Sequence, residues 1–87
     1  MAYSVEFKPS AVRDLAALPK DAQRRLALKI DSLALDPRPS GCEKIQGEAN
    51  LFRIRVGDYR IVYLIKDVRL FVLIVKIGHR KDVYRRI

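Results

Sequence analysis

With 87 residues, the chain is long enough for one domain and too short for two, so we expect a single domain over residues 1–87. Its composition, 49% hydrophobic and 32% charged, excludes a disordered or fibrous protein. The net charge of +8 is concentrated in residues 51–87, where ten basic side chains stand against three acidic ones, a net charge of +7. Such a field attracts polyanions, but charge alone does not distinguish a nucleic-acid-binding face from a basic solvated surface.

The first part of the chain predicts one strand and a helical hairpin. Residues 3–7 alternate and are rich in strand formers, which predicts a strand. Pro9 suits the first turn of a helix, and Pro19 separates this helix from a second one, predicted over residues 21–35. The second helix carries an apolar stripe of Ala22, Leu26, Ile30 and Leu33. Leu28 and Leu35 lie off this stripe, so the following loop or a partner must cover them, and we expect the loop.

Residues 36–47, with two prolines and two glycines, predict that loop. It contains Cys42, the only cysteine of the chain, which excludes a disulfide framework and a thiolate zinc site and suits a cytoplasmic protein. The longest apolar run, residues 70–75, is much shorter than a membrane span. We therefore expect neither membrane insertion nor export.

Three further strands are predicted at residues 51–56, 59–66 and 70–77, with a short turn at Gly57 and Asp58 and another around Asp67. They form an antiparallel meander. The last strand is apolar on both faces apart from Lys76, which indicates a central position in the sheet. Because helices and strands are segregated along the chain, we expect an α+β fold with the helical hairpin on one sheet face.

The two-residue turn also fixes which side chains share a face. Arg55 then pairs with Arg60, and Arg53, Arg55 and Arg60 lie together on one face. The apolar residues of the same strands turn toward the helices: Phe52, Ile54, Val56, Tyr59, Ile61 and Tyr63. Like charges that face each other across strands are destabilising, so we expect an anionic group to compensate the arginines. The alternative, that they only keep an exposed face soluble, stays open.

The residues suggest one kind of chemistry for this face. No HExxH, GxxxxGK, GxSxG or paired-histidine motif is present, and the acids of residues 51–87 lie at turns or caps, so we expect no metal site and no cofactor. Arginine forks bind phosphate oxygens and stabilise negative charge on a phosphate under attack. RNA supplies its own nucleophile, the 2′-hydroxyl. Arginine hardly deprotonates, so RNA cleavage needs a different proton acceptor.

The chain ends in GHRKDVYRRI, directly after the predicted central strand. Arg80 and Tyr84 are within reach of the rim of the arginine-bearing face, and His79 has a suitable intrinsic pKa for a proton acceptor. Lys81 and Arg85 add two cations for RNA binding. Against this, a histidine beside a glycine is often a plain loop residue, and a tyrosine near a terminus is often a packing anchor.

Four segments together resemble the RelE branch of the RelE/ParE toxins of bacterial and archaeal toxin-antitoxin systems: the MAYSVEF opening, the helical hairpin, FRIRVGDYRIVY and GHRKDVY. The resemblance covers nearly the whole chain. It implies a ribosome-dependent endonuclease that cuts messenger RNA without a metal ion and leaves a cyclic phosphate. By resemblance, Arg60 and Arg80 stabilise the scissile phosphate and Tyr84 stacks on or orients the RNA. Arg53 and Arg55 match basic positions that are lysines in the best-studied members.

The resemblance also implies partners, namely the ribosome with its messenger RNA and a cognate antitoxin of the RelB type in a hetero-oligomer. An acidic antitoxin segment would neutralise the charge of residues 51–87, and we expect it to lie over the helices and reach the sheet face. Two other functions stay open: a ParE-like toxin that binds DNA gyrase without catalysis, and a non-catalytic RNA or ribosome binder. Arg60, Arg80 and Tyr84 favour the endonuclease.

Overall fold

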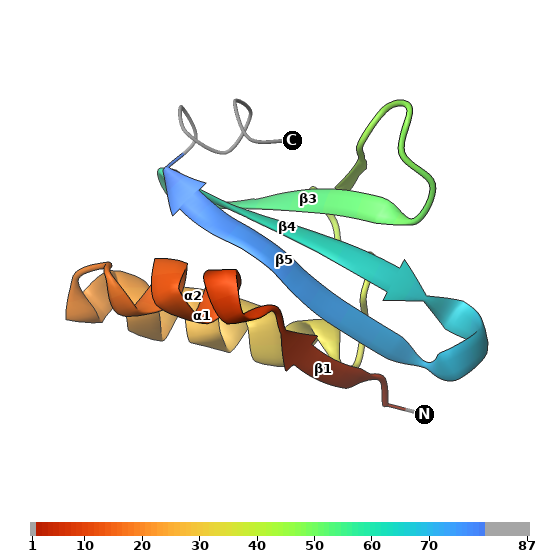
Figure 1. Ribbon diagram of the computed structural model, residues 1–87, viewed down its shortest axis with the longest axis horizontal. Coiled ribbons are helices and arrows are strands. Elements are labelled where there is room, and N and C mark those ends of the chain that lie inside the picture. The colour runs from red at the N-terminus through yellow and green to blue at the C-terminus, as the bar shows by residue number, and fades with distance from the viewer. Residues whose placement is uncertain (1, 80–87) are drawn as a thin grey trace.

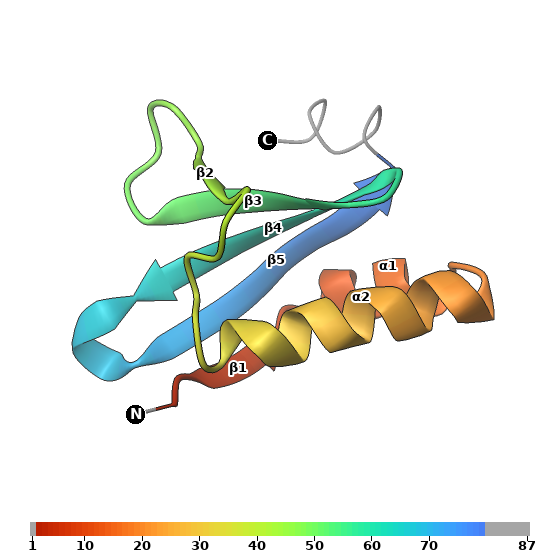
Figure 2. The same ribbon diagram turned by 180° about the vertical axis from the view of Figure 1, so that it is seen from behind.

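The computed structural model describes residues 2–79, which form a sheet with two helices packed on one face (Figure 1). In chain order the elements are β1 (Ser4–Phe7), α1 (Pro9–Ala16), α2 (Lys20–Leu33), β2 (Glu43–Lys44), β3 (Leu51–Val56), β4 (Tyr59–Lys66), the 3₁₀ turn η1 (Asp67–Arg69) and β5 (Phe71–His79). The predicted α+β class and the helical hairpin on one sheet face are confirmed, and Figure 2 shows both helices from behind.

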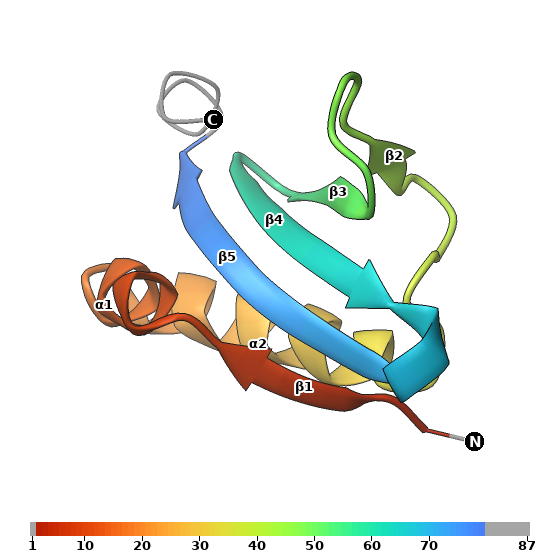
Figure 3. The same ribbon diagram turned by 45° about the vertical axis from the view of Figure 1, so that its right-hand side comes forward.

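The strands lie in the order β1-β5-β4-β3-β2, so β5 is an interior strand between β1 and β4, whereas the middle strand is β4. β1 runs parallel to β5, and every other neighbouring pair is antiparallel. The prediction of four strands is wrong by one, because β2 falls in the expected loop, where Glu43 pairs with Arg53 and Lys44 with Phe52. A two-residue strand shows no alternation, so the sequence does not reveal it. Figure 3 shows β2 at one edge of the curved sheet and β1 at the other.

Prolines set the limits of the helices. Pro9 occupies the first turn of α1, and Pro19 directly precedes α2, as the sequence predicts. The side chain of Gln23 on α2 donates hydrogen bonds to the carbonyl of Ala16 at the end of α1 at 3.3 Å and to the carbonyl of Leu18 in the linker at 2.8 Å. α2 ends at Leu33, two residues earlier than expected. Neither helix among residues 2–79 is long and apolar enough to cross a membrane.

The core lies between the helices and the sheet. The predicted stripe of α2 is buried in full, and it packs on the face of the sheet that the sequence assigns to it. The main buried members are Leu26, Ile30, Leu33, Phe52, Ile54, Ile61, Tyr63, Ile65, Val72, Ile74 and Ile77. Strand alternation therefore places the side chains of the hairpin as predicted.

The expectation that the loop after α2 covers Leu28 and Leu35 is wrong. Their side chains are 72% and 80% exposed. The loop is held elsewhere, because the buried hydroxyl of Tyr63 donates a hydrogen bond to the carbonyl of Pro37 at 2.8 Å and lies 3.1 Å from the sulfur of Cys42. Burial, together with this contact to the thiol, raises the pKa of Tyr63. The loop is thus anchored to the centre of β4.

A second anchor joins this loop to the turn between β4 and β5. Arg38 donates to both carboxylate oxygens of Asp67, from Nη1 at 3.0 Å and from Nη2 at 2.8 Å, and the Tyr3 hydroxyl donates to the same carboxylate at 2.6 Å. The hydrogen bonds from Arg38 and then from Tyr3 lower the pKa of Asp67 to about 2. The guanidinium of Arg38 also lies 5.0 Å from the ring centroid of Phe52. Both anchors fix the segment that leads into β2.

Candidate functional site

The β3–β4 hairpin brings together the three arginines that the sequence singles out. Gly57 adopts a φ of +61° in the two-residue turn, a conformation that glycine takes without strain. Arg55 pairs with Arg60 and Arg53 with Val62, which confirms the predicted register. The side chains of the three arginines therefore project from the same face of β3 and β4.

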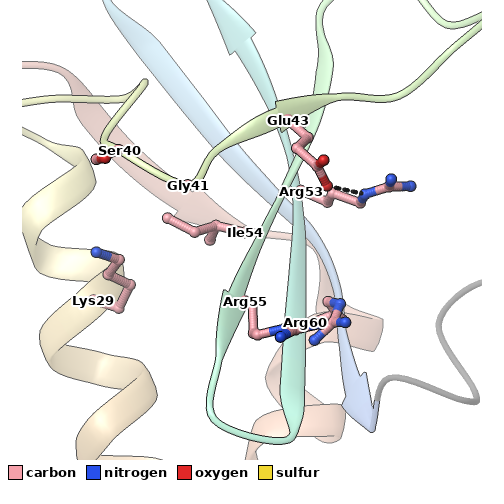
Figure 4. A pocket seen from close by; sticks show the side chains of 8 residues that line it. All are labelled: Lys29, Ser40, Gly41, Glu43, Arg53, Ile54, Arg55 and Arg60. Carbon is pink, nitrogen blue, oxygen red and sulfur yellow. Dashed lines mark hydrogen bonds and ion pairs between the residues drawn. The ribbon is translucent and has the colours of Figure 1, made fainter.

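A hollow of about 470 Å³ opens beside these arginines, at the outer edge of β3 (Figure 4). β2 pairs only with Phe52 and Arg53, so the strand partner of β3 stops short of its last three residues. The hollow is lined by Lys29, Ser40, Gly41, Glu43, Arg53, Ile54, Arg55 and Arg60. Figure 4 shows Lys29 on α2 across the hollow from the arginines of β3 and β4. The site is therefore built from a helix, a loop and a hairpin.

The hollow carries four cations and one carboxylate. Glu43, which pairs with Arg53 across β2 and β3, accepts an ion-paired hydrogen bond from Nε of Arg53 at 3.1 Å. It supplies part of the anionic compensation that the sequence leads us to expect. Lys29 and Arg55 form no ion pair within residues 2–79. The site is thus strongly positive and suits an anion with several oxygens, such as a phosphodiester.

The arginines differ in burial. Arg60, on β4, is only 7% exposed, whereas Arg55, directly opposite on β3, is exposed. A charge held away from water acts more strongly on a nearby anion because the local dielectric constant is lower. Arg60 is therefore suited to stabilise charge at a fixed point, and Arg55 to meet a ligand from solvent.

His79 does not join this cluster. Gly78 pairs with Arg60, while His79 pairs with Tyr59, and the rings of Tyr59 and His79 meet edge to face with centroids 6.2 Å apart. Tyr59 packs against the core on the helix-bearing face, so alternation directs His79 to that face. His79 therefore starts from the face opposite to that of the arginines, and its role as a proton acceptor stays a prediction. The other predicted site residues, Arg80, Lys81, Tyr84 and Arg85, lie outside the described residues.

Sequence reasoning missed two charged residues of the hollow. Glu43 was assigned to a loop, and only the tertiary pairing of β2 reveals its contact with Arg53. Lys29 lies on α2 beside the buried stripe, in a second stripe with Arg25 and Ser32. The spacing of four and three residues between these side chains is the signal that could have identified Lys29. No cluster of His, Cys, Asp or Glu side chains within residues 2–79 could hold a metal ion.

Comparisons with known proteins agree on one group of proteins. A family model described as the ParE toxin of the type II toxin-antitoxin system parDE matches residues 5–84. Toxin RelG from Mycobacterium tuberculosis is 37% identical and is aligned over 99% of this chain and 100% of its own length. The mRNA interferase toxin RelE from Escherichia coli is 25% identical, over 93% of this chain and 86% of the relative.

A solved structure shows the same fold. The archaeal RelE-RelB complex from Pyrococcus horikoshii contains a chain that matches with a TM-score of 0.83 and 31% identity, over 94% of this chain and 99% of that one. The similarity extends over the sheet, the helical hairpin and the β3–β4 hairpin alike, because it covers nearly the whole described chain. These matches confirm the resemblance that the sequence predicts.

Proposed function

Because the chain belongs to the RelE/ParE family of type II toxin-antitoxin toxins, we propose that it is a ribosome-dependent endonuclease that cuts messenger RNA without a metal ion. Its similarity to the mRNA interferase toxin RelE from Escherichia coli supports an RNA substrate. The observation that carries the proposal is the direct pairing of buried Arg60 with exposed Arg55 at the edge of the hollow. This arrangement offers one fixed and one accessible guanidinium to the same RNA strand.

The reaction needs little beyond charge stabilisation and alignment. The 2′-hydroxyl oxygen attacks the neighbouring phosphorus and loses its proton to a base, while the bond to the 5′-oxygen breaks and that oxygen takes up a proton. The products are a 2′,3′-cyclic phosphate and a 5′-hydroxyl. Negative charge grows on the phosphate oxygens in the transition state, and a preorganised guanidinium stabilises it there more than in the ground state. Arg60 is assigned this role.

The remaining predicted residues are assigned by position and type. Arg53 and Arg55 bind RNA phosphates, as do Lys81 and Arg85 in the C-terminal segment. Arg80 stabilises the phosphate together with Arg60, and Tyr84 orients the RNA. His79 is not assigned as the base, because it pairs with Tyr59 on the opposite face. Proton removal is left to the C-terminal segment, the ribosome or the RNA itself.

A cognate antitoxin of the RelB type is the expected partner. The matching archaeal structure is a RelE-RelB complex, and the hollow on this chain carries four cations against one carboxylate. An acidic antitoxin segment over this hollow would block the substrate and neutralise the charge, and both effects favour tight inhibition. The free protein should therefore bind RNA at this hollow, and the antitoxin-bound protein should not.

Cleavage on programmed ribosomes with messenger RNA in the decoding site tests the proposal. We expect a cyclic phosphate at the cut, and no cut when the attacking 2′-hydroxyl is replaced by hydrogen. Arg60→Lys keeps the charge but loses the fork, and we expect cleavage to slow by about 10²–10³-fold. Arg69→Ala, which removes an exposed arginine beside β5, is the control and should leave the rate unchanged.

Metal independence is tested with a phosphorothioate at the scissile phosphate, because the ribosome itself requires magnesium. The proposal predicts that manganese does not restore cleavage of the phosphorothioate, whereas rescue would indicate a metal ion on that oxygen. Intact messenger RNA with folded protein would refute the endonuclease. Inhibition of gyrase supercoiling under the same conditions would then establish the ParE-like alternative.

A further inference from the structure

A second hollow lies beside the first, between α2 and the end of β3, and the proposed function does not use it. Its volume is about 480 Å³, within the ~300–1,000 Å³ typical of sites that hold a small molecule or a single nucleotide. It is lined by Arg25, Leu28, Lys29, Ser32, Arg55 and Val56. Lys29 and Arg55 line both hollows, so the two adjoin each other at these side chains.

We propose that the second hollow is a groove that binds the RNA strand next to the scissile phosphate, with Lys29 and Arg25 on its phosphates. This inference rests on the proposed endonuclease function and extends the substrate path from the hairpin onto α2. Arg55 stands at the junction of the two hollows. A strand whose scissile phosphate meets Arg60 then passes Arg55 and Lys29 before it reaches Arg25.

The charges in the groove favour a polyanion. Its lining includes three cations and no carboxylate, and none of the three forms an ion pair within residues 2–79. Lys29 and Arg25 lie one turn apart on α2 and therefore project from the same side of the helix. Cations in a row along a groove are the usual means by which proteins follow a nucleic-acid backbone.

The guanidinium of Arg25 lies beside the β3–β4 hairpin. An added Cβ at Gly57 would lie 3.3 Å from Nη1 of Arg25, so the guanidinium rests against the β3–β4 turn. This contact reduces the conformational freedom that an exposed arginine would otherwise lose on binding. The turn that aligns Arg55 with Arg60 thus also positions the far end of the groove.

Most of the surface that lines the groove is apolar, but it comes from only two apolar side chains and from the aliphatic parts of the cations. Leu28, 72% exposed, and half-buried Val56 are its main apolar side chains. Two side chains can contact the face of one base, but they are too few for the buried apolar core of a protein interface. An RNA strand therefore fits this groove better than a protein segment.

The test measures binding of a fluorescein-labelled 2′-O-methyl oligouridylate, which keeps every phosphate but lacks the nucleophile. Fluorescence anisotropy over a salt series gives the slope of log K against log salt concentration. Each lost phosphate contact should make this slope shallower by about 0.7 for a single strand. We expect this change in Lys29→Ala and in Arg25→Ala, and about twice this change in the double variant.

Arg24→Ala is the matched control, because it removes the same charge from the same helix. Arg24 is exposed and lines neither hollow. Leu28→Ala should weaken binding without changing the slope, since its contact is apolar. If Lys29→Ala and Arg25→Ala behave like Arg24→Ala, the groove does not bind RNA. If they lose binding of an oligoglutamate peptide but not of RNA, the groove is a protein-docking surface and the inference is overturned.

Failure of the groove and failure of the proposed function give different results. Normal cleavage on programmed ribosomes by both α2 variants, with unchanged salt slopes, refutes the groove and leaves the endonuclease intact. Absence of cleavage by the wild-type protein refutes the endonuclease whatever the slopes are. Absence of RNA binding by the wild-type protein at low salt refutes the groove directly.

Discussion

Tyr63→Phe removes a single hydroxyl that holds the loop between α2 and β2 against the sheet. The hydroxyl is fully buried and donates to the carbonyl of buried Pro37 at 2.8 Å. It also contacts the sulfur of Cys42 at 3.1 Å. The same loop supplies Ser40 to the wall of the arginine-lined hollow. The substitution therefore tests whether one buried hydrogen bond supports both the fold and the site.

The expected cost follows from what the substitution leaves behind. Phenylalanine fills the same space, so no cavity forms, but the carbonyl of Pro37 loses its partner in a buried position. A buried polar group left without a partner costs about 1–3 kcal/mol. For a domain of this size, each kcal/mol lowers the midpoint of thermal unfolding by about 4–8 °C. The loop should also exchange its backbone hydrogens faster, because its anchor is lost.

Urea unfolding gives the free energy, and hydrogen exchange at the amide of Cys42, which donates to the carbonyl of Pro39, reports on the loop. Tyr59→Phe is the matched control, since the Tyr59 hydroxyl makes no hydrogen bond within residues 2–79 and its loss should change stability by less than about 0.5 kcal/mol. If both substitutions lower the free energy of unfolding by the same small amount, the Tyr63 hydrogen bond contributes no net stability and does not anchor the loop.

Three further substitutions test two ion pairs and one backbone conformation. Glu43→Gln should tighten RNA binding by up to about fivefold in anisotropy measurements, because a partly exposed ion pair with Arg53 is worth at most about 1 kcal/mol. Asp67→Asn should destabilise the protein above pH ~4, and the difference in unfolding free energy should shrink as the pH falls toward 2, because Arg38 lowers the pKa of Asp67 to about 2. A difference that persists at pH 2 would refute this. Gly57→Ala should cost about 1–2 kcal/mol in urea unfolding, the strain of a left-handed alanine.

Local rules account for the parts of the fold that the sequence predicts. The two-residue turn at Gly57 determines the register of β3 and β4, and the register determines which side chains share a face. Pro9 and Pro19 likewise determine where the helices begin, and the apolar stripe of α2 determines which side of that helix is buried. Each of these signals acts over a few residues. The meeting of Arg55 with Arg60 could therefore be predicted without any knowledge of the rest of the chain.

The features that the sequence does not predict depend on contacts between distant segments. β1 joins the sheet parallel to β5, a pairing across more than sixty residues that no local pattern signals. β2 exists only because its two residues meet β3, and Glu43 reaches Arg53 only through that pairing. Leu28 is exposed because the following loop is tied to Tyr63 on β4 instead. The last two decide part of the lining of the two hollows, since Glu43 lines the first and Leu28 the second.

The strand order also gives the arginines different environments, which alternation alone cannot do. Arg55 and Arg60 are equivalent by register, yet β4 lies inside the sheet and β3 loses its outer neighbour after Arg53. Arg60 is therefore buried, and Arg55 is open to solvent beside Lys29. A buried guanidinium is fixed and acts in a low dielectric, as transition-state stabilisation requires, whereas exposed cations can collect a strand from solution. Substitutions at Arg60 should consequently slow the chemical step, and substitutions at Arg55 or Lys29 should mainly weaken binding.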